Sequence, residues 1–156
     1  MKRSISSFGI LLFISLIIFN VQCSSTKDKE EESEYPLLET MGYYQRFSQK
    51  LWLAGQNENW ELAEFYAHEL HEVTEELIES NVMHDNHDLS VMAKSIIEQS
   101  IEKVDGAVDK KDQVLFREHY QLMIASCNVC HIKTGHQFIK IIIPTDSSIF
   151  NQQFSN

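Results

Sequence analysis

Five consecutive residues near the end of the chain have the types and spacing of a haem-attachment motif. Cys127-Asn128-Val129-Cys130-His131 is a CxxCH pentapeptide, which is typical of covalent c-type haem attachment. Two thiols three positions apart on a helical turn can each add to a haem vinyl group, while the adjacent imidazole reaches the iron. The motif therefore predicts one haem c held by thioether bonds to Cys127 and Cys130, with His131 as the proximal iron ligand.

Two other kinds of site also use a CxxC pair. A thioredoxin-like redox pair belongs in a βαβ context, and a zinc site needs a second pair of ligands. The sequence around residues 127–131 shows no alternation of strands and helices, and the chain has no second CxxC. Neither context is present, so haem attachment is the favoured interpretation, with zinc or free thiols as its alternatives.

The first 22 residues are typical of a bacterial export signal. Lys2 and Arg3 form a positively charged n-region, and residues 8–19 form an apolar h-region that is short for a membrane span. Cys23 follows where bacterial lipoproteins carry their lipidated cysteine, although Gln22 replaces the small residue usual before it. We expect a lipid anchor on Cys23 in preference to a simply cleaved signal or an uncleaved signal anchor. The protein would then lie on the periplasmic or outer-surface side of a membrane.

A short acidic stretch separates this signal from the rest of the chain. Residues 24–34 contain no apolar side chain, so residues 23–34 are expected to be a lipidated cysteine followed by a disordered tether. Without residues 1–22 the chain has 11 basic and 23 acidic residues, a formal charge of −12. This charge argues against nucleic acid as a partner. The remaining residues, 35–156, have the length of one small domain.

The elements that position the motif are helical by their apolar period. The first segment stops near Gly55, and Asn57 or Asn59 can cap the second. The expected apolar stripes are Leu37, Met41, Tyr44, Ser48 and Leu51; then Ala63, Tyr66, Leu70, Val73 and Leu77; then, after a turn-rich stretch at 81–88, Leu89, Ala93, Ile96, Ile97, Ile101, Val104 and Val108; and, after a turn at 109–112, Leu115, Leu122, Met123 and Val129.

Glycine and proline mark the expected ends of these elements. Gly106 weakens the end of the third helix, Gly135 marks the end of the fourth, and Pro144 marks the end of the ordered extension. Four such helices joined by short connections predict an all-α fold, an up-down-up-down four-helix bundle. The haem would lie near the C-terminal part of helix four.

This topology nominates a second axial ligand. If helix four ends near Phe138, His131 lies roughly 10 Å from that end; if helix one begins near Pro36, Met41 lies roughly 7 Å inside it. The two residues then fall at one level of the bundle. Met41 is the leading candidate for the distal iron ligand, through its thioether sulfur, and the alternative is an apolar lid that fills the distal pocket.

Other side chains are weaker candidates for the haem site. His84 and His87 lie in the second connection, at the haem end, and rival Met41, although a surface loop is their alternative. His119 is about 18 Å from His131 along the same helix, and so is too far away. The rest are expected on the surface or at most at a haem edge: His68, His71 and His136, with Arg46, Lys133 and Lys140 as either propionate partners or solvated cations.

A single CxxCH on the last helix of a bundle resembles the class II c-type cytochromes, the cytochrome c-prime group. More closely, residues 50–56, 59–63, 127–138 and 150–154, together with Pro144, are similar to small exported cytochrome c family proteins of Bacteroidetes-type bacteria. The likeness spans most of residues 37–154. It implies a sixth iron site facing the first helix, with Met in low-spin members and an open iron in high-spin members. Met41 falls on that position.

Three functions follow as expectations. The first is a monohaem one-electron carrier in the bacterial cell envelope, with no enzyme activity, with redox proteins as partners and with a homodimer left open. The second is a five-coordinate haem protein that binds or senses a small gas such as nitric oxide. The third is a non-haem helical surface lipoprotein. The carboxylates of the second helix form no catalytic constellation and are expected to be a solvated face.

Overall fold

The computed structural model describes residues 35–145, 150 and 152–155, which belong to one compact unit, Tyr35–Asn156. The predicted export signal, Cys23 and the acidic tether lie outside these residues. Among the helices that the structure describes, none is long and apolar enough to cross a membrane.

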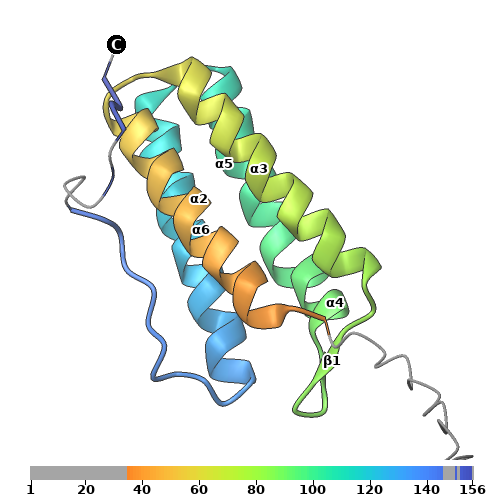
Figure 1. The fold of residues 1–156 in the computed structure, drawn as a ribbon. Helices are drawn as coiled ribbons and strands as arrows, with labels where there is room; N and C mark the ends of the chain where they lie inside the picture. Colours follow the sequence, from red (N-terminus) through yellow and green to blue (C-terminus); the bar gives the residue numbers. More distant parts are fainter. Residues whose placement is uncertain (1–34, 146–149, 151, 156) are drawn as a thin grey trace, which may run out of the picture. The chain divides into compact units, whose positions relative to one another are not determined.

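The fold is all-α, as the apolar period predicts. Figure 1 shows α2 and α5 running in one direction and α3 and α6 in the other. α2 packs mainly on α3 and α5 mainly on α6, while contacts between α3 and α5 and between α2 and α6 link the two pairs. The helices are α2 (Leu37–Gln56), α3 (Trp60–Glu79), α4 (Leu89–Met92), the π-helical segment η1 (Ala93–Glu98), α5 (Gln99–Asp109) and α6 (Gln113–Lys133).

Short polar side chains cap the beginnings of α3 and α6. Asn59 caps α3 by accepting a 3.3 Å hydrogen bond from the backbone N–H of Leu62. Asp112 caps α6 by accepting from the N–H groups of Val114 and Leu115, both at 3.0 Å. Each carboxylate or amide oxygen satisfies N–H groups that have no partner within the helix. Of the two residues expected to cap α3, Asn59 is therefore the correct one.

The burial of side chains confirms the predicted apolar stripe of α3 fully and that of α6 only in part. All five stripe residues of α3 are buried. On α6, by contrast, Leu122 is 50% exposed and Val129 is 40% exposed, so their prediction as core residues is wrong. The buried face of α6 follows Phe116, Tyr120 and Met123, and a helix turns about 100° per residue, which carries Leu122 off that face.

The third predicted helix and the connection before it differ in detail from expectation. α4, η1 and α5 follow one another without a break, and Gly106 lies inside α5. The turn-rich stretch forms a small hairpin, in which β1 (Met83–His84) pairs antiparallel with β2 (His87–Asp88). Asp85 and Asn86 form its two-residue turn with φ of 47° and 64°. Positive φ at both central residues is the mark of the type I′ turn that fits a hairpin.

Some residues beyond Pro144, where the ordered extension was expected to end, pack against the helices: among them are Phe150 and Phe154. Phe154 is only 5% exposed, and its ring lies 5.9 Å from that of Phe150. The hydroxyl of Tyr66 on α3 donates a 2.8 Å hydrogen bond to Oε1 of Gln152. These aromatic residues bury enough apolar area to hold the tail, and a proline signal read alone does not reveal this.

Candidate functional site

The CxxCH motif occupies the last two turns of α6, where the backbone ends in a Schellman motif. Gly135, with φ of 79°, donates from its N–H to the carbonyl of Ile132 at 3.2 Å, and the N–H of His136 donates to the carbonyl of His131 at 2.7 Å. Gly135 therefore marks the helix end as predicted. The helix ends at Lys133 and not near Phe138, so His131 lies in its last turn. The expected 10 Å between His131 and the helix end is wrong.

Both motif thiols face the protein interior. Cys127 and Cys130 are unbonded and partly buried, and they pack against the core cluster. Burial raises the pKa of Cys127 to about 12, with a further contribution from Cys130. Burial also raises the pKa of Cys130 to about 11, against the opposing charge of Lys133. Since the thiolate is the nucleophile in disulfide exchange, two thiols that stay neutral at pH 7 do not favour a catalytic redox pair.

Tyr44 on α2 packs against the same core cluster as these thiols. Burial raises its pKa above the ordinary range, and Cys127 and Cys130 raise it further, as only nearby groups do. The Tyr44 hydroxyl donates to Oγ1 of Thr74 at 2.8 Å, and Thr74 donates onward to the carbonyl of Leu70 at 2.6 Å. The apolar period placed Tyr44 on the inner stripe of its helix, but nothing in the sequence marked it as a neighbour of the motif.

Asn128, between the two cysteines, fixes the chain that follows α6. Its Nδ2 donates to the carbonyls of Ile124 at 3.0 Å and Ile141 at 2.9 Å, and its Oδ1 accepts from the N–H of Ile141 at 2.8 Å. The amide thus pairs with the backbone of Ile141 much as a neighbouring strand would. Asn128 occupies one of the two variable positions of the CxxCH motif, so the sequence pattern did not indicate this role.

The imidazole of His131 is oriented by the same returning chain. Its Nδ1 lies 2.7 Å from the carbonyl oxygen of Ile139. A carbonyl only accepts, so Nδ1 donates this bond and Nε2 is the ring nitrogen left for another partner. Histidines that bind a metal usually donate their other ring N–H to such an acceptor. Two inward thiols and an imidazole with a free Nε2 one residue further on fit the attachment of a c-type haem.

Met41 lies in the second turn of α2 and is partly buried. Within the described part of the chain it is not among the partly buried residues that pack against the core cluster. Tyr44, one turn further along α2, is among them. No hydrogen bond or core contact in the structure joins Met41 to His131, so its role as distal ligand stays a prediction.

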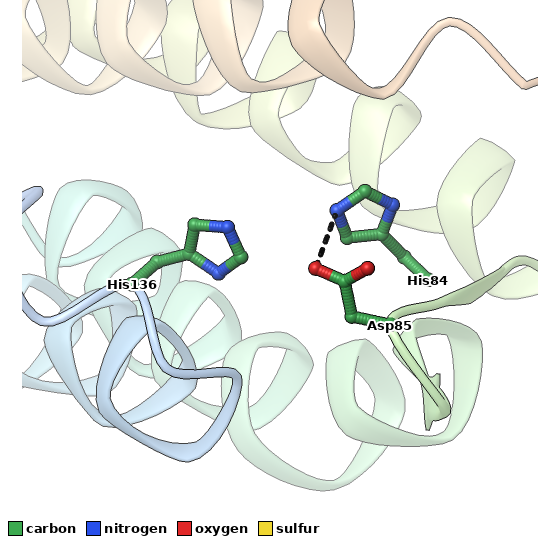
Figure 2. A group of neighbouring side chains, drawn as sticks. All are labelled: His84, Asp85 and His136. Atoms are coloured by element: carbon green, nitrogen blue, oxygen red, sulfur yellow. Dashed lines mark ion pairs between the residues drawn. The ribbon is translucent and has the colours of Figure 1, made fainter.

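The other predicted candidates are spread over the surface. His84 lies 3.5 Å from Asp85, and its ring centroid is 6.0 Å from that of His136 (Figure 2). His87 in β2 is partly buried. The remaining histidines have partners elsewhere: His68 with Glu72 at 3.8 Å, His71 with Asp105 at 3.4 Å, and His119 with the carbonyl of Lys103 at 2.7 Å.

The cations suggested as propionate partners are all exposed: Arg46, Lys133 and Lys140. Lys133 lies closest in sequence to the motif, and it lowers the pKa of Cys130 against the effect of burial. Among these three cations, Lys133 is therefore the one that affects the pKa of a motif thiol.

The chain was compared with protein-family models, curated proteins and solved structures, and none of them matches it.

Proposed function

We propose that the chain is a monohaem c-type cytochrome that carries single electrons in the bacterial cell envelope. The observation that carries the proposal is the hydrogen bond between His131 Nδ1 and the carbonyl of Ile139, which leaves Nε2 for another partner in the residue that directly follows two partly buried thiols. Metal-binding histidines usually have their other ring nitrogen held by such an acceptor.

Each residue of the motif has a defined task in this proposal. Cys127 and Cys130 would hold the group through thioether bonds, and His131 would bind its iron through Nε2. Haem iron, when bound, supplies one-electron oxidation and reduction. The Ile139 carbonyl fixes the plane and tautomer of the imidazole, and Asn128 fixes the chain that carries this carbonyl. Ligands that are held in place limit how much the site must rearrange when the iron changes its oxidation state.

The proposed architecture is an up-down-up-down four-helix bundle with Met41 at the level of the iron. Tyr44 is near enough to Cys127 for that thiol to raise its pKa, and α2 and α6 run in opposite directions (Figure 1). One turn back along α2 from Tyr44 then corresponds to one turn forward along α6 from Cys127. These steps lead to Met41 and to His131, so the thioether of Met41 is the proposed sixth ligand.

Covalent attachment is tested directly on a denaturing gel. The full chain, produced in a bacterium with a c-type haem-attachment system, should give a band that stains for haem after denaturation. A variant carrying Cys127→Ser and Cys130→Ser should lose the stain, while Cys23→Ser, changed outside the motif, should keep it. An unstained wild-type band would reject the proposal in favour of a non-haem surface lipoprotein.

Export and anchoring form a separate part of the proposal. We place the protein on the periplasmic or outer-surface side of a membrane, held by lipid on Cys23, because residues 1–23 have the pattern of a lipoprotein signal. The wild-type chain should fractionate with membranes and Cys23→Ser with the soluble fraction. Equal amounts of both in the soluble fraction would reject the anchor without affecting haem attachment.

A second candidate function rests on Tyr44. This side chain packs against the core cluster as the thiols do, whereas Met41 does not, and its hydroxyl donates to Thr74. If Met41 stays aside, the iron has one protein ligand and an open face that a small gas such as nitric oxide or carbon monoxide can occupy. A ferrous spectrum that is high-spin and changes promptly with carbon monoxide would favour this function over electron transfer.

A further inference from the structure

A cluster of three potential metal ligands lies beside the end of α6, outside the CxxCH motif. His84 and Asp85 come from the β1–β2 hairpin, and His136 comes from the chain just after α6. Each offers one ligand atom, and these atoms all lie within 4.8 Å of one another. Figure 2 shows the His136 ring pointing toward the hairpin pair from the opposite side. Residues about fifty positions apart in sequence therefore converge on one point.

The spacing within the cluster suits a tetrahedral ion. Nε2 of His84 and Oδ2 of Asp85 are 3.5 Å apart. Two ligands on a tetrahedral zinc ion, with bonds of about 2.0–2.2 Å, lie roughly 3.3–3.5 Å from each other. The hairpin pair already has this separation. Bringing a His136 nitrogen to the same distance needs only a small side-chain movement.

Backbone structure holds both sides of the cluster in place. On one side, the type I′ turn fixes Asp85 directly after His84, with positive φ at Asp85 and Asn86. On the other side, the N–H of His136 donates to the carbonyl of His131 at 2.7 Å. The ring Nδ1 of His136 lies 3.2 Å from Oγ1 of Thr134, and this leaves its Nε2 for another partner. Such outer contacts orient metal-binding histidines.

We propose that His84, Asp85 and His136 bind one divalent transition-metal ion of the zinc class. Two imidazole nitrogens and one carboxylate oxygen favour zinc and its neighbours over calcium and magnesium, which prefer oxygen ligands. Three protein ligands leave a fourth position for water. The ion would tie the hairpin to the chain that directly follows the haem-attachment motif.

The test is a calorimetric titration of Zn²⁺ into the full-length protein, first stripped with EDTA. We expect one ion per chain, and we expect Mg²⁺ and Ca²⁺ at the same concentrations to give no binding heat. His84→Ala, Asp85→Ala and His136→Ala should each weaken Zn²⁺ binding by roughly tenfold or more, because even outer contacts of a metal site contribute ten- to hundredfold. His87→Ala, on the same hairpin, and His119→Ala, elsewhere on α6, are the matched controls and should bind as the wild type does.

Three outcomes would overturn the proposal. The first is that the wild type does not take up one Zn²⁺ per chain. The second is that the three ligand variants bind Zn²⁺ as tightly as the controls. The third is a change of iron spin state in His84→Ala or His136→Ala, since that would assign the imidazole to the haem. Visible spectra of the same samples record this. On protein that carries no haem, the titration uses the variant with Cys127→Ser and Cys130→Ser, which removes the motif thiols as competing zinc ligands, so its result is independent of the proposed cytochrome function.

Discussion

Asn128 and Ile141 are joined by two hydrogen bonds that run in opposite directions between a side-chain amide and a backbone. Nδ2 of Asn128 donates to the carbonyl of Ile141 at 2.9 Å, and the N–H of Ile141 donates to Oδ1 at 2.8 Å. Ile139, two residues earlier on the same chain, supplies the carbonyl that orients His131. The position between the cysteines thus supports the histidine that follows them.

Asn128→Ala should destabilise the folded chain by about 1–3 kcal/mol, because it removes both bonds and leaves the polar groups of Ile141 to find other partners. Urea unfolding measures the change. Gln121→Ala, at an exposed site on the same helix, is the control and should stay within about 0.5 kcal/mol of the wild type. Equal stability of the two variants would show that the hydrogen bonds between Asn128 and Ile141 contribute nothing to the free energy of unfolding.

Met41→Ala should convert the iron of the loaded protein from low-spin to high-spin, since it removes the proposed thioether ligand. The absorption spectrum of the ferric and ferrous protein records the change. Met83→Ala is the control, because Met83 lies in the hairpin with 63% of its surface exposed. An unchanged spectrum in Met41→Ala would reject the ligand assignment and leave haem attachment intact.

Gly55→Ala and Gly106→Ala should have opposite effects on stability. A Cβ on Gly55 would overlap the ring of Phe116, whereas a Cβ on Gly106 would meet nothing within 4 Å. Overpacking at the first site should destabilise by about 1–3 kcal/mol, and the better helix propensity of alanine should stabilise the second by about 0.5–1 kcal/mol. Thermal unfolding of both variants measures this. A stabilised Gly55→Ala would show that α2 and α6 pack less closely than described.

Without haem, the protein should lose stability as the pH rises above about 9. The folded state raises the pKa of Cys127 to about 12 and that of Cys130 to about 11, so it holds both protons more tightly than the unfolded state. The stabilisation is complete below pH 9 and is lost between pH 9 and those values, by up to about 1.4 kcal/mol per pH unit for each thiol.

Urea unfolding at pH 8 and pH 10.5 under reducing conditions checks this expectation. Tyr44 and Tyr120 also have raised pKa values, chiefly from burial, so the thiol effect is the difference between the wild type and the variant with Cys127→Ser and Cys130→Ser. The haem-attached protein has thioethers in place of thiols and should behave as that variant does. A pH dependence shared by all three proteins would assign the effect to other groups.

The sequence predicted the regular parts of the fold and the local part of the site. The period of α3, its cap at Asn59 and the helix end at Gly135 depend on neighbouring residues only, and each was confirmed. The placement of Tyr44 near the motif and of Gly55 against Phe116 depends on how α2 packs against α6. A local sequence pattern does not specify the packing of two helices against each other.

The chain after α6 is the clearest failure of local reasoning. Pro144 correctly marks chain that is not helical, but it says nothing about whether that chain packs. Phe154 is buried in the core cluster with its ring against Phe150, and Gln152 accepts a hydrogen bond from Tyr66. The same applies to His84 and His136, whose proximity follows from a hairpin turn and a helix end that are remote in sequence.

Two hydrogen bonds between residues remote in sequence bear on the order in which the fold forms. The bond between Tyr66 and Gln152 spans 86 positions, and that between Tyr120 and Ser48 spans 72. Contacts of such high sequence separation form after local helices, because closing the intervening loops costs entropy first. The two bonds therefore belong to a late stage of folding, after the helices and the shorter-range bonds of Asn128 and His131 have formed.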